Sequence, residues 1–500
     1  MSANRLHECG VAFSHFINQL DIKTSAGSAE APLLVVINNW YQTPVPFFSA
    51  LIGLGALQQS GCPLVFVIND CPYPGSAAAA PIAVIKEHCA GLARFGRLVY
   101  LSEHAEAETG DSIVDIQAEA VAMDRRHRYG FGIIPADHLP VFDSEASDHA
   151  GPALRGFAAL LATEKPACVL IPGGVANTMH GFMALARRQG VRTATYDAGA
   201  GTPRVYFSGH DVAAQGWEVP GLVRQILNRA DPRELEYCRG LAYRHADLVA
   251  TGADDMLRFP FEMPAAVMNN DLLFLTSMEQ DSSLLGVPGI FPTQEEWLRE
   301  TIMAVRRTHP QARITVRQHP DERRFRSPYG ERAVAIAQAL AANDPLLTVY
   351  DTRDNIQTRA LIAASSLVLS AGSTAGLEAG MLGRPVLSHA MVPYVGLGFC
   401  ERPADREDFF ARIRRHLDAP ARLPAEAVLE AALFYYAKNY CWRVEIPVTP
   451  DPPIFLDWIS TATTLPFAVE GFRHVVEAIA TGANLCQLRH GANLRSAGIA

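Results

Sequence analysis

Short apolar runs alternate with longer segments of helical periodicity along almost the whole chain. The runs hold four to six residues, mostly Val, Leu and Ile, and the segments between them repeat apolar residues every three or four positions. This alternation predicts parallel strands connected by helices, because strands buried on both faces read as continuous apolar runs. The predicted strands are 33–37, 64–68, 98–101, 168–171 and 191–196 in a first series, and 272–276, 313–317, 346–350, 367–370 and 386–389 in a second.

A stretch rich in Pro and Met, without clean periodicity, separates the two series. A chain of 500 residues is too long for one ordinary core, so we expect two doubly wound α/β domains that face a cleft. Ligands of such sheets bind at the carboxyl ends of the strands. The predicted parts are an N-terminal extension 1–30, a first Rossmann-like domain 31–255, a linker 256–270, a second Rossmann-like domain 271–450 and a helical segment 451–500, in which 467–490 reads as one terminal helix.

Composition narrows the class of protein. A net charge of −9 argues against a nucleic-acid partner. No apolar run approaches the roughly 18 residues that span a bilayer, and the first residues lack the apolar region of a signal peptide. Nine scattered cysteines without a Cys-x-x-Cys pair indicate reduced thiols and a cytoplasmic location. Arginine clusters such as 125–128 and 412–415 are usually solvated helix faces, and they are also compatible with a peripheral contact with the inner membrane.

The turn 370-SAGSTAGLEAG-380 joins a predicted strand to a predicted helix. Gly372 lets the backbone approach a ligand closely, while Ser373 and Thr374 place hydroxyls and N–H groups at a helix N-terminus, which favours anions. Glu378, one turn further on, could accept hydrogen bonds from ribose hydroxyls. A simple N-cap would need only one such hydroxyl residue. We therefore favour a site for a phosphate and its ribose.

A histidine follows the predicted strand 313–317. In 316-VRQHPDERRF-325 the proline stops the strand and presents His319 at its carboxyl end. A histidine there can donate a hydrogen bond or a proton to a leaving phosphate, because its pKa lies near neutrality. Arg317 could add positive charge, or it could be a structural ion-pair partner.

Three further strand ends carry polar residues that should face the same cleft. Asp281 and Ser282 follow the strand 272–276, although an ordinary capped turn would look the same. Asp197 ends the strand 191–196 and is a candidate general base. Asn177 and His180, after the strand 168–171, are candidate contacts for an acceptor substrate.

Several common phosphate and hydrolase motifs are absent from the sequence. It contains no Asp-x-Asp, no P-loop, no strand followed by Gly-x-Gly-x-x-Gly and no Gly-x-Ser-x-Gly. Phosphate charge would then be neutralised by His, Arg, hydroxyls and a helix N-terminus. We expect no metal and no cofactor in the reaction.

The order of these motifs resembles a known family. A strand with Arg-x-His-Pro, then Ser-Thr-x-Gly-x-Glu-Ala, Leu-Gly-Arg-Pro-Val and a Tyr-x-x-x-Gly at 394–398, is similar to the bacterial capsule polysaccharide biosynthesis glycosyltransferases, which include Kdo transferases. The resemblance covers roughly 165 to 400 and is most specific from 272 to 398. It implies the GT-B fold, with two Rossmann-like domains and a cleft between them.

The resemblance also implies a substrate and roles for the residues. The donor would be a CMP-activated Kdo or sialic-acid-like (nonulosonic) sugar, with its phosphate between His319 and the Ser373–Thr374 turn. By the same match Asp281 would be the nucleophile of a retaining enzyme and Asp197 its acid/base. In an inverting enzyme Asp197 would instead activate the acceptor hydroxyl. The acceptor would be a surface glycan, a lipid-linked glycan or a protein.

Other functions fit part of the pattern. They are a UDP- or GDP-sugar glycosyltransferase or epimerase of the same fold, a teichoic-acid-type glycerophosphotransferase, and a degenerate protein that binds a nucleotide sugar without turnover. The glycerophosphotransferase normally carries a strongly basic surface, which a chain of net charge −9 supplies poorly.

Overall fold

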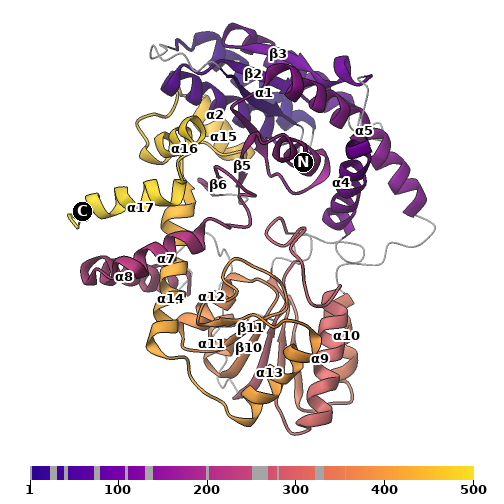
Figure 1. The fold of residues 1–500 in the computed structure, drawn as a ribbon, viewed down its shortest axis with the longest axis vertical. Helices are drawn as coiled ribbons and strands as arrows, with labels where there is room; N and C mark the ends of the chain where they lie inside the picture. Colours follow the sequence, from indigo (N-terminus) through magenta and orange to yellow (C-terminus); the bar gives the residue numbers. More distant parts are fainter. Residues whose placement is uncertain are drawn as a thin grey trace.

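The computed structural model has two α/β lobes, which Figure 1 shows above and below the centre of the molecule. It describes residues 3–22, 31–38, 43–71, 79–106, 111–129, 139–198, 202–250, 269–278, 281–320, 332–354 and 356–499. Two separate, mainly parallel sheets confirm the predicted fold class. In the described part of the chain no helix combines the length and apolarity needed to cross a bilayer.

The first sheet has the strand order β13-β6-β5-β4-β1-β2-β3. Its core, β3-β2-β1-β4-β5, is parallel, and the sheet is extended by two antiparallel pairings, β5 with β6 and β6 with β13. The strands are β1 (Leu33–Ile37), β2 (Leu64–Ile68), β3 (Arg97–Tyr100), β4 (Cys168–Pro172), β5 (Arg192–Ala198), β6 (Arg204–Ser208) and β13 (Arg443–Glu445).

Alternate residues of these strands enter two different cores, as the pleat requires. In β1, Leu33, Val35 and Ile37 pack on one face, and Leu34 and Val36 pack on the other. The first face is covered by α1 (Ala3–Gln19), α2 (Val45–Ser60), α3 (Ala79–Cys89), α15 (Pro452–Ile459) and α16 (Glu470–Thr481), and the second by α4 (Asp111–Tyr129), α5 (Leu139–Glu164) and α6 (Asn177–Arg188). The lobe is therefore a three-layer α/β/α unit.

The second sheet repeats the strand order of the parallel core of the first. Its order β12-β11-β10-β7-β8-β9 is parallel throughout. The strands are β7 (Asn270–Leu275), β8 (Ile314–Arg317), β9 (Leu347–Tyr350), β10 (Ser365–Ser370), β11 (Val386–Ser388) and β12 (Cys400–Glu401). The helices packed on it are α7 (Val219–Arg229), α8 (Pro232–Ala250), α9 (Gln294–Thr308), α10 (Arg332–Ala341), α11 (Thr358–Ala363), α12 (Thr374–Met381), α13 (Arg406–Asp418) and α14 (Ala425–Tyr436).

The chain passes between the lobes twice. Helices α7 and α8 precede the predicted linker 256–270, yet their apolar side chains lie in the core of the second lobe. After α14, a π-helical turn, η4 (Ala437–Trp442), leads to β13, which pairs with β6 of the first sheet. Residues 443–450, expected in the second domain, thus begin with a strand of the first. Most of the expected linker lies outside the described residues, and β7 begins at Asn270.

Helix α16 and the start of a second helix occupy residues 467–490, where the pattern predicted one terminal helix. Helix α16 ends at Gly482, whose φ of 76° is the left-handed conformation that terminates many helices. Helix α17 (Leu485–Ser496) then begins with Asn484, whose side chain accepts a hydrogen bond from the N–H of Gln487. Gly482 and Asn484 together end one helix and start the next.

Candidate functional site at the interface of the two lobes

A cavity of about 170 Å³ lies where the carboxyl ends of the second sheet meet the loops of the first lobe. Its walls come from both lobes and from the second crossing of the chain. The lining residues are Ala214, Gln215 and Gly216 from the first lobe, Ser277, Met278, Asp281, Ser283, Leu284, His319, Gly372, Ser373, Thr374, Leu377, Val392, Pro393, Tyr394 and Phe434 from the second, and Lys438 and Trp442 from η4. The predicted residues Asp281, His319 and the Ser373–Thr374 turn thus share one cavity.

The turn after β10 depends on a glycine. Gly372 has a φ of 120°, and a Cβ there would lie 2.6 Å from Cγ1 of Val392 and 2.7 Å from Cδ2 of Leu284. Only glycine adopts this conformation without strain. Ser373 then caps α12 by accepting a hydrogen bond from the N–H of Ala375 at 3.2 Å. The turn therefore brings both hydroxyls to the wall of the cavity.

Part of the hydrogen-bonding capacity of this turn is already used within the turn. The Ser370 hydroxyl accepts from the N–H groups of Gly372 and Ser373 at 3.1 and 3.2 Å. The N–H of Ala375 is satisfied by the Ser373 cap. The sequence pattern suggested a turn of free N–H donors. In the structure it is the Thr374 hydroxyl, at the start of α12, that contacts a charged group outside the turn.

That charge belongs to Lys438, which the sequence reading did not single out. Its Nζ donates to the Thr374 hydroxyl at 2.6 Å, and the side chain lines the cavity. Burial lowers the pKa of Lys438 to about 8, although Asp281 and Glu378 act against this shift. Lys438 lies in the π-helical turn η4, and such turns occur frequently at functional sites. The cavity therefore has a cation beside its hydroxyl turn.

The two residues predicted after β8 have different surroundings. His319 lines the cavity, and its backbone N–H donates to the Thr276 hydroxyl at 3.0 Å. Arg317 is 3% exposed and donates from Nη1 to the carbonyl oxygen of Asp351 at 2.7 Å. Arg317 thus holds the end of β9 and does not line the cavity, whereas His319 is placed to reach a ligand.

Two carboxylates from different lobes influence each other, and of the two only Asp281 lines the cavity. Asp197 is in β5 of the first lobe, and Asp281 follows β7 of the second. Burial raises the pKa of Asp197 to about 6, and the negative charge of Asp281 adds to the shift. The Ser282 side chain donates a hydrogen bond to Asp197 and partly opposes it. Asp281 accepts from the N–H of Ser283 at 2.8 Å. Neighbouring carboxylates in different environments are a common arrangement for acid–base work.

Glu378 is half-buried behind the cavity wall. Burial raises its pKa to about 7, while the positive charges of Arg359 and Lys438 limit the increase. Glu378 is not among the residues that line the cavity, so its predicted contact with a ribose stays a prediction.

The raised pKa of Glu378 predicts a stability effect. Because the folded-state pKa lies above that of the unfolded chain, wild-type stability should fall as pH rises from about 4 through 7. The glutamine of Glu378→Gln is neutral at every pH, so the Tm of this variant should exceed that of the wild type at pH 8. Each kcal/mol gained in the free energy of unfolding raises Tm by roughly 2–4 °C. The gain should vanish near pH 4. Thermal melts across this pH range measure the difference. The exposed Glu426→Gln should show no such pH-dependent gain, and an equal gain would contradict the interpretation.

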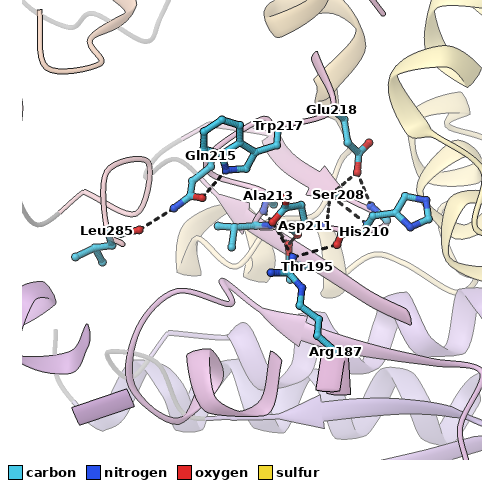
Figure 2. Close-up of polar contacts among 12 residues, drawn as sticks. Arg187, Thr195, Ser208, His210, Asp211, Ala213, Gln215, Trp217, Glu218 and Leu285 are labelled. Atoms are coloured by element: carbon cyan, nitrogen blue, oxygen red, sulfur yellow. Dashed lines mark hydrogen bonds and ion pairs between the residues drawn. The ribbon is translucent and has the colours of Figure 1, made fainter. Parts of the chain in front are cut away.

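A polar network fixes the first-lobe side of the cavity (Figure 2). Gln215 donates from Nε2 to the carbonyl oxygen of Leu285 at 2.7 Å and accepts from the Trp217 indole N–H at 2.7 Å. Leu285 belongs to the second-lobe loop that carries Asp281, yet its side chain is buried in the core of the first lobe. The loop is thus held against the first lobe by this hydrogen bond, by the one from Ser282 to Asp197, and by the buried side chain of Leu285.

Other predicted residues lie elsewhere or outside the described set. His180, on α6, has its Nε2 3.8 Å from a carboxylate oxygen of Glu119 on α4 and does not line the cavity. Asn177 begins α6, and its side chain lies outside the described residues. The acceptor contacts predicted for these two residues therefore stay predictions.

Part of the chain is similar to a known protein family. Residues 235–435 match the model of a family described as capsule polysaccharide biosynthesis protein. No curated protein matches the chain. Solved structures that the chain matches include the KpsC β-Kdo 2,4-transferase of Thermosulfurimonas dismutans, at 18% identity over 59% of this chain and 88% of that chain, with a TM-score of 0.38. They also include the UDP-GlcNAc 2-epimerase of Neisseria meningitidis, at 12% identity over 80% and 94%, with a TM-score of 0.26.

The matched region contains most of the cavity walls. It includes Asp281, His319, Thr374 and Tyr394, and it ends three residues before Lys438. The resemblance seen in the sequence motifs is thereby confirmed. Over residues 235–435 the chain is similar to the capsule polysaccharide biosynthesis proteins.

Proposed function

We propose that the protein is a glycosyltransferase that moves a Kdo or related nonulosonic sugar from a CMP-activated donor to a surface glycan or glycoconjugate, without a metal ion. The observation that carries the proposal is the cavity shared by His319, Thr374, Lys438 and Asp281, with Asp197 near enough for the charge of Asp281 to raise its pKa. The family of residues 235–435 agrees with a role in capsule synthesis.

The donor phosphate would lie at the hydroxyl turn. Lys438 and His319 can supply a positive charge and a hydrogen-bond donor, and the start of α12 supplies a favourable dipole. A monophosphate leaving group carries less charge than a diphosphate. One lysine, one histidine and a helix N-terminus are then a sufficient set of partners, and the chain contains no Asp-x-Asp for a metal-bound diphosphate.

The two carboxylates would have different roles, one in proton transfer and one at the anomeric carbon. Asp197, with a pKa of about 6, can take the proton from an acceptor hydroxyl at neutral pH. Asp281 lines the cavity beside Lys438 and is placed to attack the anomeric carbon as the leaving CMP departs. In a retaining enzyme both steps occur. In an inverting enzyme Asp197 activates the acceptor hydroxyl for direct attack, and Asp281 only stabilises positive charge.

CMP should raise the Tm of the purified protein, and EDTA should not reduce the shift. A ligand that binds only the folded state adds about 2.7 kcal/mol at a hundredfold excess over its Kd. UMP, UDP and GDP are the matched comparisons, measured by the same thermal melts. A shift with UDP or GDP and none with CMP would overturn the donor assignment and favour a UDP- or GDP-sugar enzyme of the same fold.

A further inference from the structure

Two histidines and a glutamate meet on the outside of the first lobe. They are His7 on α1, and Glu87 and His88 on α3. One ligand atom from each lies within 4.8 Å of the others, and none of the three residues lines the cavity. His88 Nε2 and His7 Nδ1 are 3.2 Å apart. The cluster joins two helices that are distant in sequence.

Ser14 contacts His88 at two points. The Ser14 hydroxyl donates to the carbonyl oxygen of His88 at 3.3 Å, and its oxygen lies 3.0 Å from Nδ1 of the same residue. In the tautomer with a proton on Nδ1, Nδ1–H donates to the Ser14 oxygen. The lone pair of Nε2 is then available on the side of His7, 3.2 Å from its Nδ1. A hydrogen bond from the non-coordinating ring nitrogen is the usual way in which proteins orient a metal-binding histidine.

The spacing of the two nitrogens suits a shared metal ion. Two ligands at about 2.0–2.1 Å from a tetrahedral zinc lie roughly 3.3 Å apart, close to the 3.2 Å between His7 Nδ1 and His88 Nε2. Glu87 is exposed, so its carboxylate can rotate to complete three protein ligands. The fourth position would be open to water.

A glycine makes room for the His88 ring. Gly10 lies in the interior of α1, where alanine would stabilise the helix by roughly 1 kcal/mol. A Cβ at Gly10 would lie 2.2 Å from Cδ2 of His88. The ring, 6% exposed, is therefore packed in a defined position against α1 while Nε2 faces His7.

We propose that His7, Glu87 and His88 bind a divalent d-block cation of the Zn²⁺ type, which ties α1 to α3. Two imidazoles and one carboxylate select such an ion over Mg²⁺ or Ca²⁺, which prefer oxygen ligands. The site is separate from the cavity and independent of the proposed transferase reaction.

The test uses the full chain stripped with EDTA and then titrated with Co²⁺ or Zn²⁺. We expect one ion per chain, a tetrahedral Co²⁺ visible spectrum without thiolate bands, since all nine cysteines are buried, and a rise in Tm. His7→Ala should weaken binding by more than about 100-fold, because losing a ligand costs more than losing a second-layer partner. Mg²⁺ should give no shift.

His15→Ala is the matched control. His15 is also exposed on α1, and its Nε2 lies 2.8 Å from Nε2 of Gln19 in the same helix. It should bind Co²⁺ like the wild type. Absence of stoichiometric binding by the wild type, or equal binding by His7→Ala, would overturn the proposal. Neither readout involves a nucleotide, so failure here leaves the proposed function untouched.

Discussion

Asp197→Asn should lower kcat for sugar transfer by about 10²–10⁴-fold, the usual contribution of a positioned general base. Asparagine keeps the shape of Asp197 and the hydrogen bond from Ser282 but cannot take a proton from the acceptor. Because the base works in its ionised form, wild-type activity should rise as pH increases through about 6. The activity of the variant should not show this rise. Rates across pH 5–8 with a CMP-sugar and an acceptor measure both effects.

Binding and stereochemistry separate the roles of the two carboxylates. The CMP-induced Tm shift of Asp197→Asn should match that of the wild type, as should the activity of Asp457→Asn, an exposed residue of α15. Retention at the anomeric carbon together with a large loss in Asp281→Asn identifies Asp281 as the nucleophile. Full activity in both Asp197→Asn and Asp281→Asn would contradict a catalytic site here and favour a nucleotide-sugar-binding protein.

Lys438→Met should weaken CMP binding by about 10–100-fold, as expected when a charge-assisted hydrogen bond to a phosphate is lost. The methionine fills the same volume but brings no charge to the Thr374 turn. Since only the protonated amine serves, wild-type affinity should also fall as pH rises through about 8, the pKa of Lys438. Isothermal titration calorimetry with CMP gives both quantities.

Two comparisons make this result specific. Lys165→Met removes an exposed lysine of the first lobe and should bind CMP normally. Lys438→Arg should recover part of the affinity, because the charge returns with a different geometry. If Lys438→Met binds CMP as tightly as the wild type, the phosphate lies away from the hydroxyl turn.

The periodic pattern predicted the interior strands well and the short ones poorly. The runs at 33–37 and 64–68 coincide with β1 and β2, because a strand buried on both faces must be apolar throughout. The strands β12 and β13 have only two and three residues. A segment of that length cannot show a period, so its pairing depends on the neighbouring strand.

The candidate site also contains residues that the sequence predicts and residues that it does not. His319 and Thr374 could be predicted because parallel strands bring their carboxyl ends to one edge, so polar residues at those ends must meet. Lys438 follows a long helix and faces the cavity only because η4 turns the chain toward the first lobe. Nothing in the local residues around Lys438 indicates that turn. The hydrogen bonds that the Ser370 hydroxyl accepts from N–H groups of the same turn also depend on the folded geometry.

The double passage of the chain between the lobes also limits how this architecture can be divided. A fragment with the bounds of the family match, 235–435, would lack α7 and η4, whose Val223, Ile226 and Cys441 are buried in the core of the second lobe. A first lobe made from the residues before 235 would lack its edge strand β13 and the helices α15 and α16. Recombination between relatives at the family boundary would therefore pack α7 and η4 of one relative against the second-lobe core of the other.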